Sequence, residues 1–187
     1  MEELLQTIKS IIPLSEKCER RLCEIWKPIF VKKGDFLFQE GKVCRHLYYI
    51  QRGSIICYHF SNDIKVCDWF RFENDFFNSS DSFLLQTVST DNFEALEDTE
   101  LLMINYEDYQ RQYIDFPELG HLGRVLAEKY YLKNIIRMKY FQFTNVEEKY
   151  ALLLKNEPEL LTRVPLGHIA SYLGITQESL SRIRGKK

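Results

Sequence analysis

The sequence has no long uncharged apolar run, and this absence is the first feature that narrows its class. A membrane-spanning helix needs about 20 consecutive apolar residues, and no stretch of the 187-residue chain approaches that length. The opening residues, MEELLQTIKS, are acidic and amphipathic, whereas a secretory signal combines basic residues with an apolar stretch. We therefore expect a cytoplasmic protein that does not enter the membrane.

Cysteine is scarce and irregularly spaced. Five cysteines, an odd number without a framework-like spacing, indicate reduced thiols rather than disulfides. None has the C-x-x-C spacing of many metal sites, and none of the four histidines has a second ligand at a metal-like spacing. Cys18 and Cys23 would point about 140° apart on a helix, which makes a poor chelate. We expect no metal and no cofactor.

The familiar catalytic motifs are also missing. The sequence has no Gly-rich phosphate loop, no nucleophile elbow and no paired carboxylates in a recognisable frame. It has no internal repeat and no low-complexity segment. These absences argue against an enzyme and favour a binding or regulatory protein.

What the chain does have is a core-forming composition and an uneven charge. Hydrophobic residues make up 45% and charged residues 28%, enough to bury a core and stay soluble. The formal net charge is −2. From Leu160 onward, however, five Lys or Arg stand against one acid, Glu178, which gives that end +4 and the rest −6. Basic residues gathered at one end indicate a phosphate-facing surface.

The middle of the chain predicts short strands separated by turns. Two helices come first, residues 1–12 and Glu16–Trp26, the second capped by Ser15. Regularly spaced strands with turn residues between them favour an antiparallel barrel or sandwich. The candidate strands are Ile29–Val31, Phe36–Gln39, His46–Ile50, Ile55–Phe60, Lys65–Phe72, Phe93–Glu97 and Leu101–Asn105.

Helices are predicted again after the strands. A short one runs from about Tyr106 to Tyr113, and Pro117 opens a long one that reaches about Phe141. The apolar stripe of the long helix could pair with a second copy of itself or pack on its own barrel. Asn145 is placed to cap a further helix, Val146–Lys155. The stripe consists of Leu122, Leu126, Tyr130, Ile136 and Tyr140.

The last 24 residues predict two short helices joined by a sharp turn. Gly174 falls at the turn, where a positive φ suits glycine, and Thr176 can cap the second helix. This spacing is typical of a helix-turn-helix whose second helix enters a DNA major groove. The inward positions are Ile169, Ala170 and Leu173 in the first helix and Ile175, Leu180 and Ile183 in the second.

The outward face of that second helix carries side chains suited to reading bases. Arg182 can bind guanine and Gln177 can bind adenine. Glu178 can accept from cytosine, and Ser181 can bond to a base or a phosphate. An ordinary helical hairpin with a solvated polar face is the alternative. Four further residues are expected to support DNA binding, through the cap and through phosphate contacts: Thr176, Arg184, Lys186 and Lys187.

Three features together resemble the Crp/Fnr family of bacterial transcription regulators. They are the stretch Val31–Tyr58 with glycines at 34, 41 and 53, the long helix, and the Glu-x-x-Ser-Arg pattern that ends at Arg182. The resemblance implies an α+β fold: an N-terminal antiparallel β-roll of the cyclic-nucleotide-binding type, a dimerisation helix and a C-terminal winged helix-turn-helix. The corresponding ranges are 1–116, 117–143 and 144–187, with a short wing at about Glu159–Val164.

The ligand positions depart from that family's pattern. Where nucleotide-binding members have Gly-Glu-Leu and Arg-Ser/Thr-Ala, this chain has residues 78–80, Asn-Ser-Ser, and residues 89–91, Ser-Thr-Asp. The arginine that pairs with the cyclic phosphate is missing, and Asp91 adds negative charge. We therefore expect no tight binding of cAMP or cGMP. The roll's aromatic residues either line another pocket or form plain core; the pocket candidates are Phe76, Asn78, Ser79, Ser80, Ser89 and Thr90.

The resemblance also implies partners. A regulator of this type binds double-stranded DNA as a homodimer, contacts RNA polymerase and can respond to a small-molecule effector, which the sequence does not define. The alternative is a sensor or scaffold whose roll binds a ligand or partner while its terminal helices do not read DNA.

Overall fold

The computed structural model describes residues 1–143 and 145–185, and these divide into two units. The first unit comprises Met1–Cys57 and Phe70–Glu128. The second comprises Tyr58–Trp69 and Lys129–Lys187. Two strands and the long helix each contribute residues to both units, so the chain passes between them more than once.

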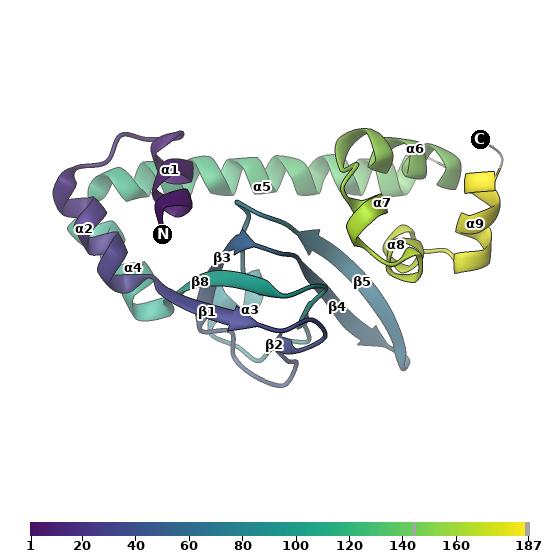
Figure 1. Cartoon of the computed structure of the whole chain (residues 1–187), viewed down its shortest axis with the longest axis horizontal. Coiled ribbons are helices and arrows are strands. Elements are labelled where there is room, and N and C mark those ends of the chain that lie inside the picture. The colour runs from purple at the N-terminus through teal and green to yellow at the C-terminus, as the bar shows by residue number, and fades with distance from the viewer. Residues whose placement is uncertain (144, 186–187) are drawn as a thin grey trace. The chain divides into compact units, whose positions relative to one another are not determined.

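The strands form two four-stranded sheets, with orders β1-β8-β3-β6 and β2-β7-β4-β5. Figure 1 shows β8 between β1 and β3, and β4 beside β5. All seven strands predicted from the sequence are present, with ends shifted by one or two residues in most cases. The eighth, β6, was not predicted because it has two residues and exists through its pairing with β3. The strands are β1 Lys27–Val31, β2 Phe36–Phe38, β3 His46–Arg52, β4 Ile55–Ser61, β5 Ile64–Arg71, β6 Phe76–Phe77, β7 Asn92–Ala95 and β8 Thr99–Asn105.

Strand β3 is buried on both faces, and this divides the core of the first unit into two layers. Consecutive strand residues point to opposite faces. Tyr48 stacks on Phe77, whereas its neighbour Tyr49 contacts Phe76, with ring centroids 5.2 and 4.9 Å apart. Tyr48 therefore belongs to the interior of the roll, and Tyr49 belongs to the layer where helices cover the sheet.

Five helices begin in the first unit: α1 Glu2–Lys9, α2 Glu16–Ile25, α3 Ser80–Leu85, α4 Tyr106–Asp115 and α5 Pro117–Phe143. Helix α5 continues into the second unit. Ser15 caps α2 as predicted, because its hydroxyl accepts from the Cys18 N–H at 3.2 Å. Helices α1, α2, α4 and the start of α5 pack through one apolar cluster that includes Leu4, Ile8, Leu22, Trp26, Tyr49, Phe76, Leu102, Phe116, Leu119 and Leu122.

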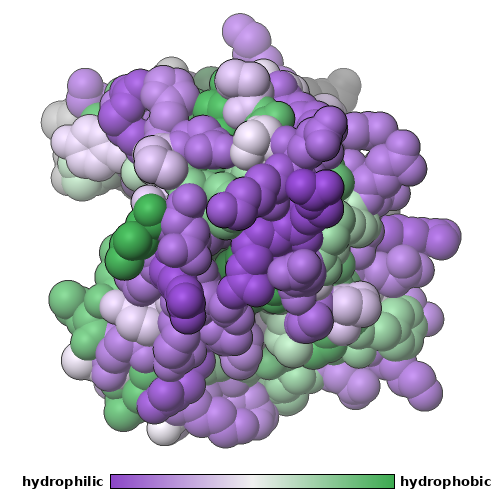
Figure 2. Space-filling model, turned by 90° about the vertical axis from the view of Figure 1, so that its left-hand side faces the viewer, coloured by the Kyte–Doolittle hydropathy of each residue, from purple (hydrophilic) through white to green (hydrophobic). Residues whose placement is uncertain are grey.

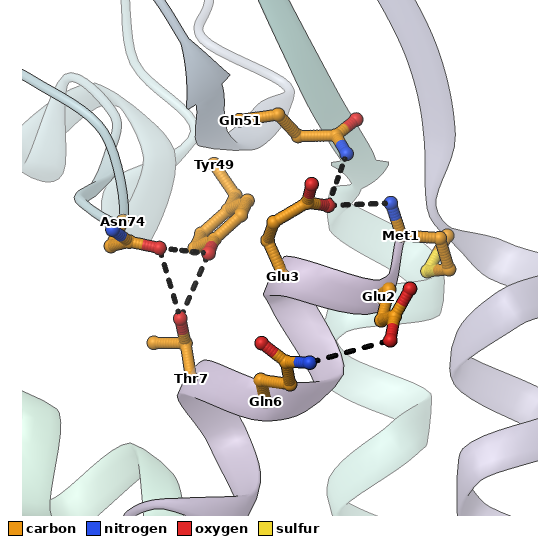
Figure 3. A network of polar contacts seen from close by, with 8 residues as sticks. All are labelled: Met1, Glu2, Glu3, Gln6, Thr7, Tyr49, Gln51 and Asn74. Carbon is orange, nitrogen blue, oxygen red and sulfur yellow. Dashed lines mark hydrogen bonds and ion pairs between the residues drawn. The ribbon is translucent and has the colours of Figure 1, made fainter.

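A polar network attaches α1 to the sheet (Figure 3). Tyr49 donates its hydroxyl hydrogen to Asn74 Oδ1 at 2.8 Å, and the Thr7 hydroxyl lies 2.8 Å from the Tyr49 hydroxyl. Glu3 accepts from Gln51 at 3.1 Å and lies 3.5 Å from the Met1 ammonium group. Because β3 and the turn after β5 both take part, the first helix is fixed to two separate segments of the roll.

The face around α1, α2 and α4 is mostly hydrophilic, and its apolar residues occupy small separate areas (Figure 2). This agrees with the inward direction of Leu4, Ile8 and Leu22, which are almost completely buried. Within the described residues, no helix combines the length and the apolar character that crossing a membrane requires.

In its described residues the second unit holds the end of α5 and four shorter helices: α6 Val146–Asn156, α7 Leu160–Arg163, α8 Leu166–Leu173 and α9 Gln177–Gly185. Asn145 caps α6 as predicted and forms a reciprocal capping box with Glu148. The prediction of a short wing at Glu159–Val164 is wrong, because these residues form α7 and not strands. Leu160 and Val164 are buried on one side of that turn of helix, which fixes the segment.

Candidate functional site

Helices α8 and α9 form a tightly joined pair. Gly174 has φ +72°, and its N–H and that of Ile175 bond to the last carbonyls of α8. This left-handed turn is the one predicted for Gly174, since glycine adopts it without strain. Thr176 caps α9 by accepting from the Ser179 N–H at 3.3 Å. The buried side chains of the two helices are Ile169, Ala170, Leu173 and Leu180.

The predicted reading residues on α9 are all exposed. The structure brings Glu178, Ser181 and Arg182 onto the side away from buried Leu180. Gln177 is exposed too, but its amide oxygen would lie 3.0 Å from a Cβ built on Gly167, so it leans toward α8. Thr176 and Arg184 are exposed as well, whereas Lys186 and Lys187 lie outside the described residues.

Two electrostatic details shape this face. The pKa of Glu178 is lowered by a bond to its own backbone N–H and by the Thr176 hydroxyl, which favours the charged carboxylate. Arg182 donates to the Ser179 hydroxyl at 3.4 Å. The sequence reasoning did not single out Ser179, although its position three residues from both Thr176 and Arg182 is the signal that could have identified it.

A hollow of about 400 Å³ lies between the start of α6 and α9. Its walls combine aliphatic groups with Arg182 and Glu147, so the arginine borders both the open face and this hollow. The residues that line it are Val146, Glu147, Ile175, Ser179, Arg182 and Ile183.

The second candidate site, inside the roll, is held together by its own hydroxyl groups. Ser79 and Ser89 are buried, with their hydroxyl oxygens 2.8 Å apart. Ser79 also donates to Asp81 at 3.1 Å, and Ser89 accepts from the Asp91 N–H at 2.9 Å. The two serines that sequence reasoning placed at a ligand position therefore bond to each other and to residues two positions further along the chain.

The other predicted pocket residues do not converge on that serine pair. Ser80 and Thr90 are exposed, and Ser80 donates to Asn78 at 3.0 Å. Phe76 lies on the helix-covered side of the sheet, against Trp26 and Tyr49. Phe76 could not be assigned to a side from sequence, because it and Phe77 are adjacent aromatic residues in a two-residue strand.

The interior of the roll is packed with aromatic rings. Phe93 has ring centroids at 5.2 Å from Phe38, 5.5 Å from Phe77 and 6.5 Å from Tyr48. These distances are those of edge-to-face and tilted aromatic contacts in a core. Burial also raises the pKa of the Tyr48 hydroxyl. It raises the pKa of the Cys44 thiol as well, next to α3, where the Cys44 N–H donates to the Ser82 hydroxyl. Such groups stay neutral and serve packing.

The two units have opposite charge. The first contains 13 Lys and Arg against 20 Asp and Glu, a net of −7. The second contains 12 Lys and Arg against 7 Asp and Glu, a net of +5. The positive unit is the one that presents the polar face of α9, and a phosphate backbone would be attracted to it.

Residues 28–114 match the model of the family described as the cyclic nucleotide-binding domain. The β-roll of the first unit is therefore a domain of that fold. Comparison with curated proteins gives no match.

Solved structures extend the similarity across most of the chain. The c-di-GMP-responsive global regulator CLP of Xanthomonas campestris is 18% identical over 92% of this chain and 91% of its own, with a TM-score of 0.71. A Crp/Fnr-family transcriptional regulator from Eubacterium rectale is 19% identical over 91% and 82%, also at 0.71. The catabolite activator protein of Thermus thermophilus is 20% identical over 92% and 83%, at 0.56. The neighbours of this fold thus include Crp/Fnr-type transcription regulators.

Proposed function

We propose that this protein is a dimeric, sequence-specific DNA-binding transcription regulator of the Crp/Fnr type. The observation that carries the proposal is the exposed polar face of α9, with Glu178, Ser181 and Arg182 on a helix anchored through Leu180 to α8. The positive charge of the second unit and the regulators among the structural neighbours support it.

In this proposal α8 and α9 act as a helix-turn-helix, with α9 in the major groove. Arg182 and Glu178 contact base edges, and Gln177 and Ser181 come next. Arg184, together with Lys186 and Lys187, neutralises phosphates and so contributes affinity without sequence information. The regulator contacts RNA polymerase from its DNA site. Because α7 replaces strands, the reader has no β-wing at Glu159–Val164.

We infer that dimerisation uses the second half of α5. The first part of the apolar stripe is already occupied, since Leu122 is buried in the first unit's core and Leu126 packs against it. Further along, large apolar side chains are half exposed or more, in one pair seven residues apart and one pair four residues apart, so that the two members of each pair share a side of the helix. They are Tyr131, Leu132, Ile136 and Met138. Tyr140, the last residue of the predicted stripe, has a side chain outside the described set.

We further infer that the roll does not bind cAMP or cGMP tightly. The Ser79 and Ser89 hydroxyls bond to each other, and Asp91 lies two residues from Ser89 where a nucleotide-binding roll would present positive charge. An effector of another kind would act by changing how the two α5 helices meet, because this moves the two readers relative to each other.

The proposal is tested by selecting sequences from fragmented genomic DNA with the purified full-length protein and measuring affinity for the best site by fluorescence anisotropy. We expect a roughly palindromic site whose half-sites are about one helical turn apart, and salt-sensitive binding. A protein that enriches no sequence and binds no DNA at low salt would instead be a ligand- or partner-binding roll without a DNA-reading role.

A further inference from the structure

The free edge of β5 meets helix α8 within the second unit. β5 is the last strand in the order β2-β7-β4-β5, so among the described residues one of its edges has no neighbouring strand. Backbone groups on such an edge need other partners. Residues two apart on a strand direct their N–H and C=O groups to the same edge, and this applies to Lys65 and Cys67.

One hydroxyl group satisfies both of these positions. Ser171 of α8 donates to the Lys65 carbonyl oxygen at 3.0 Å and accepts from the Cys67 N–H at 3.0 Å. A serine hydroxyl has one donor hydrogen and two acceptor lone pairs, so it can replace the carbonyl and the N–H that a neighbouring strand would supply. An alanine side chain could neither donate to the Lys65 carbonyl oxygen nor accept from the Cys67 N–H.

The surrounding contacts keep this junction closed. Tyr172, next to Ser171, lies under the Arg137 guanidinium of α5, with 4.5 Å between the cation and the ring centroid. The Cys67 side chain is buried, at 3% exposure. The pKa of its thiol is raised, mainly because burial disfavours the thiolate and secondarily because Asp68 is near. Strand β5, helix α5 and helix α8 therefore converge at one point.

The hairpin that carries this junction starts in the roll. Strand β4 begins at Ile55 in the first unit, and from Tyr58 its residues belong to the second. The α8 end of the junction is linked to α9 through the turn between them, where the Ile175 N–H donates to the Ala170 carbonyl oxygen at 3.0 Å, and Ala170, Leu173 and Leu180 are all buried. The predicted reading residues of α9 remain exposed, so the junction holds the helix pair without covering its reading face.

We propose that the two hydrogen bonds of Ser171, called the tie below, fix the α8–α9 pair to the end of the β4–β5 hairpin. Through this tie the hairpin becomes a second route, besides α5, by which the roll controls DNA binding. The DNA part of this inference rests on the proposed function; the tie itself does not. Ser171 is a positioning residue, since it acts through the hairpin and not on the DNA.

The tie is tested first without DNA, through the reactivity of the Cys67 thiol. Full-length protein is labelled with a thiol reagent, and peptide mass spectrometry follows Cys67 separately from exposed Cys23, which serves as an internal standard for reagent access. Ser171→Ala is expected to raise the Cys67 labelling rate about tenfold, because local opening no longer breaks two hydrogen bonds. Ser171→Thr keeps a hydroxyl and is expected to restore slow labelling.

A matched control removes a hydroxyl from the same hairpin without touching the junction. Ser61 is exposed at the end of β4, and Ser61→Ala is expected to leave the Cys67 rate unchanged. Equal Cys67 rates in wild type and Ser171→Ala, in proteins with the same circular dichroism spectrum, would overturn the tie.

The second measurement is affinity for the DNA site selected with wild-type protein. Ser171→Ala is expected to weaken binding about fivefold, because the reader must now be ordered when it binds. Affinity equal to or tighter than wild type would overturn the coupling. If wild-type protein binds no DNA, the proposed function fails and the coupling fails with it, while the labelling rates still decide the tie.

Discussion

The two units use their polar residues in opposite ways. In the first, which carries −7, serines and tyrosines such as Ser79, Ser89 and Tyr49 are buried and bond to one another or to neighbouring segments. In the second, which carries +5, the polar residues of α9 face solvent. Buried polar groups that are satisfied internally serve the fold, whereas the exposed polar side chains of α9 are available to a partner.

The cores differ in a related way. The roll is filled by aromatic rings around Phe93, whereas the helix pair is held mainly by aliphatic side chains such as Ile169, Leu173 and Leu180. A substitution in the roll should therefore change stability, and one on the α9 face should change recognition. Each experiment below tests that separation.

The largest effect is expected for Phe93→Ala. Phe93 is fully buried among Phe38, Tyr48 and Phe77, so its loss leaves a cavity and should cost about 3–5 kcal/mol of the free energy of unfolding. Denaturant unfolding measures this loss. Thr90→Ala, at an exposed position near β7, is the control and should change stability by less than about 0.5 kcal/mol. A tolerated Phe93→Ala would mean that the interior is a loosely filled pocket.

Titration with cAMP comes next. Without an arginine on the phosphate, affinity should be weaker by about a hundredfold or more than in a roll that has one. Isothermal calorimetry of the purified protein is expected to show no saturation at micromolar cAMP. Micromolar binding would show that the roll is a nucleotide sensor despite the internal bonding of Ser79 and Ser89.

Arg182→Ala should change recognition without changing stability. It is expected to relax specificity at one operator position by about 1–3 kcal/mol, measured by anisotropy on a set of single-base operator variants. Arg163→Ala is the matched control, because Arg163 is ion-paired with Glu159 at 3.0 Å within the same unit. Uniform weakening across all variants would assign Arg182 to phosphate instead.

Asn145→Ala tests the cap at the start of α6. Loss of the capping box should lower the stability of the second unit by about 1 kcal/mol. Thermal unfolding and amide exchange of α6 report it. Asn156→Ala, at the other end of α6, is the control, because it removes the same type of side chain from a position that does not cap the start of the helix. Equal effects of the two changes would contradict a role for the cap.

The smallest effect is expected for Lys186→Gln. It should weaken binding of all sequences about equally and reduce the slope of log affinity against log salt by about 1. Lys42→Gln, in the acidic unit, makes the same chemical change and should leave the slope unchanged. A change in slope from Lys42→Gln would remove the distinction between the units.

The sequence predicted the elements well wherever one residue type has a specific backbone role. Ser15 and Asn145 marked helix starts through their caps, and Gly174 marked the turn between α8 and α9 through its positive φ. Gly53 is similar: it has φ +103°, and a Cβ there would lie 2.8 Å from the Thr99 backbone. These signals are local, so a linear sequence contains them.

The errors arose where pairing or packing decides. Strand β6 exists through its register with Tyr48 and Tyr49, and the segment expected to be a wing forms a turn of helix on buried Leu160. The base-reading roles of Glu178 and Arg182 stay predictions, although their exposure is now described. Ser171 carried no signal in the sequence, because its partners in β5 lie more than 100 residues earlier.

By itself, the sequence determined the order of roll, long helix and helix pair, the caps and turns that bound them, and the concentration of positive charge toward the end of the chain. Only the tertiary structure decided which aromatic residues face the interior of the roll, that Ser79 and Ser89 satisfy each other, and that α8 closes the edge of β5. The physical reason is that caps and turns depend on neighbouring residues, whereas burial and edge pairing depend on segments that meet only when the chain has folded.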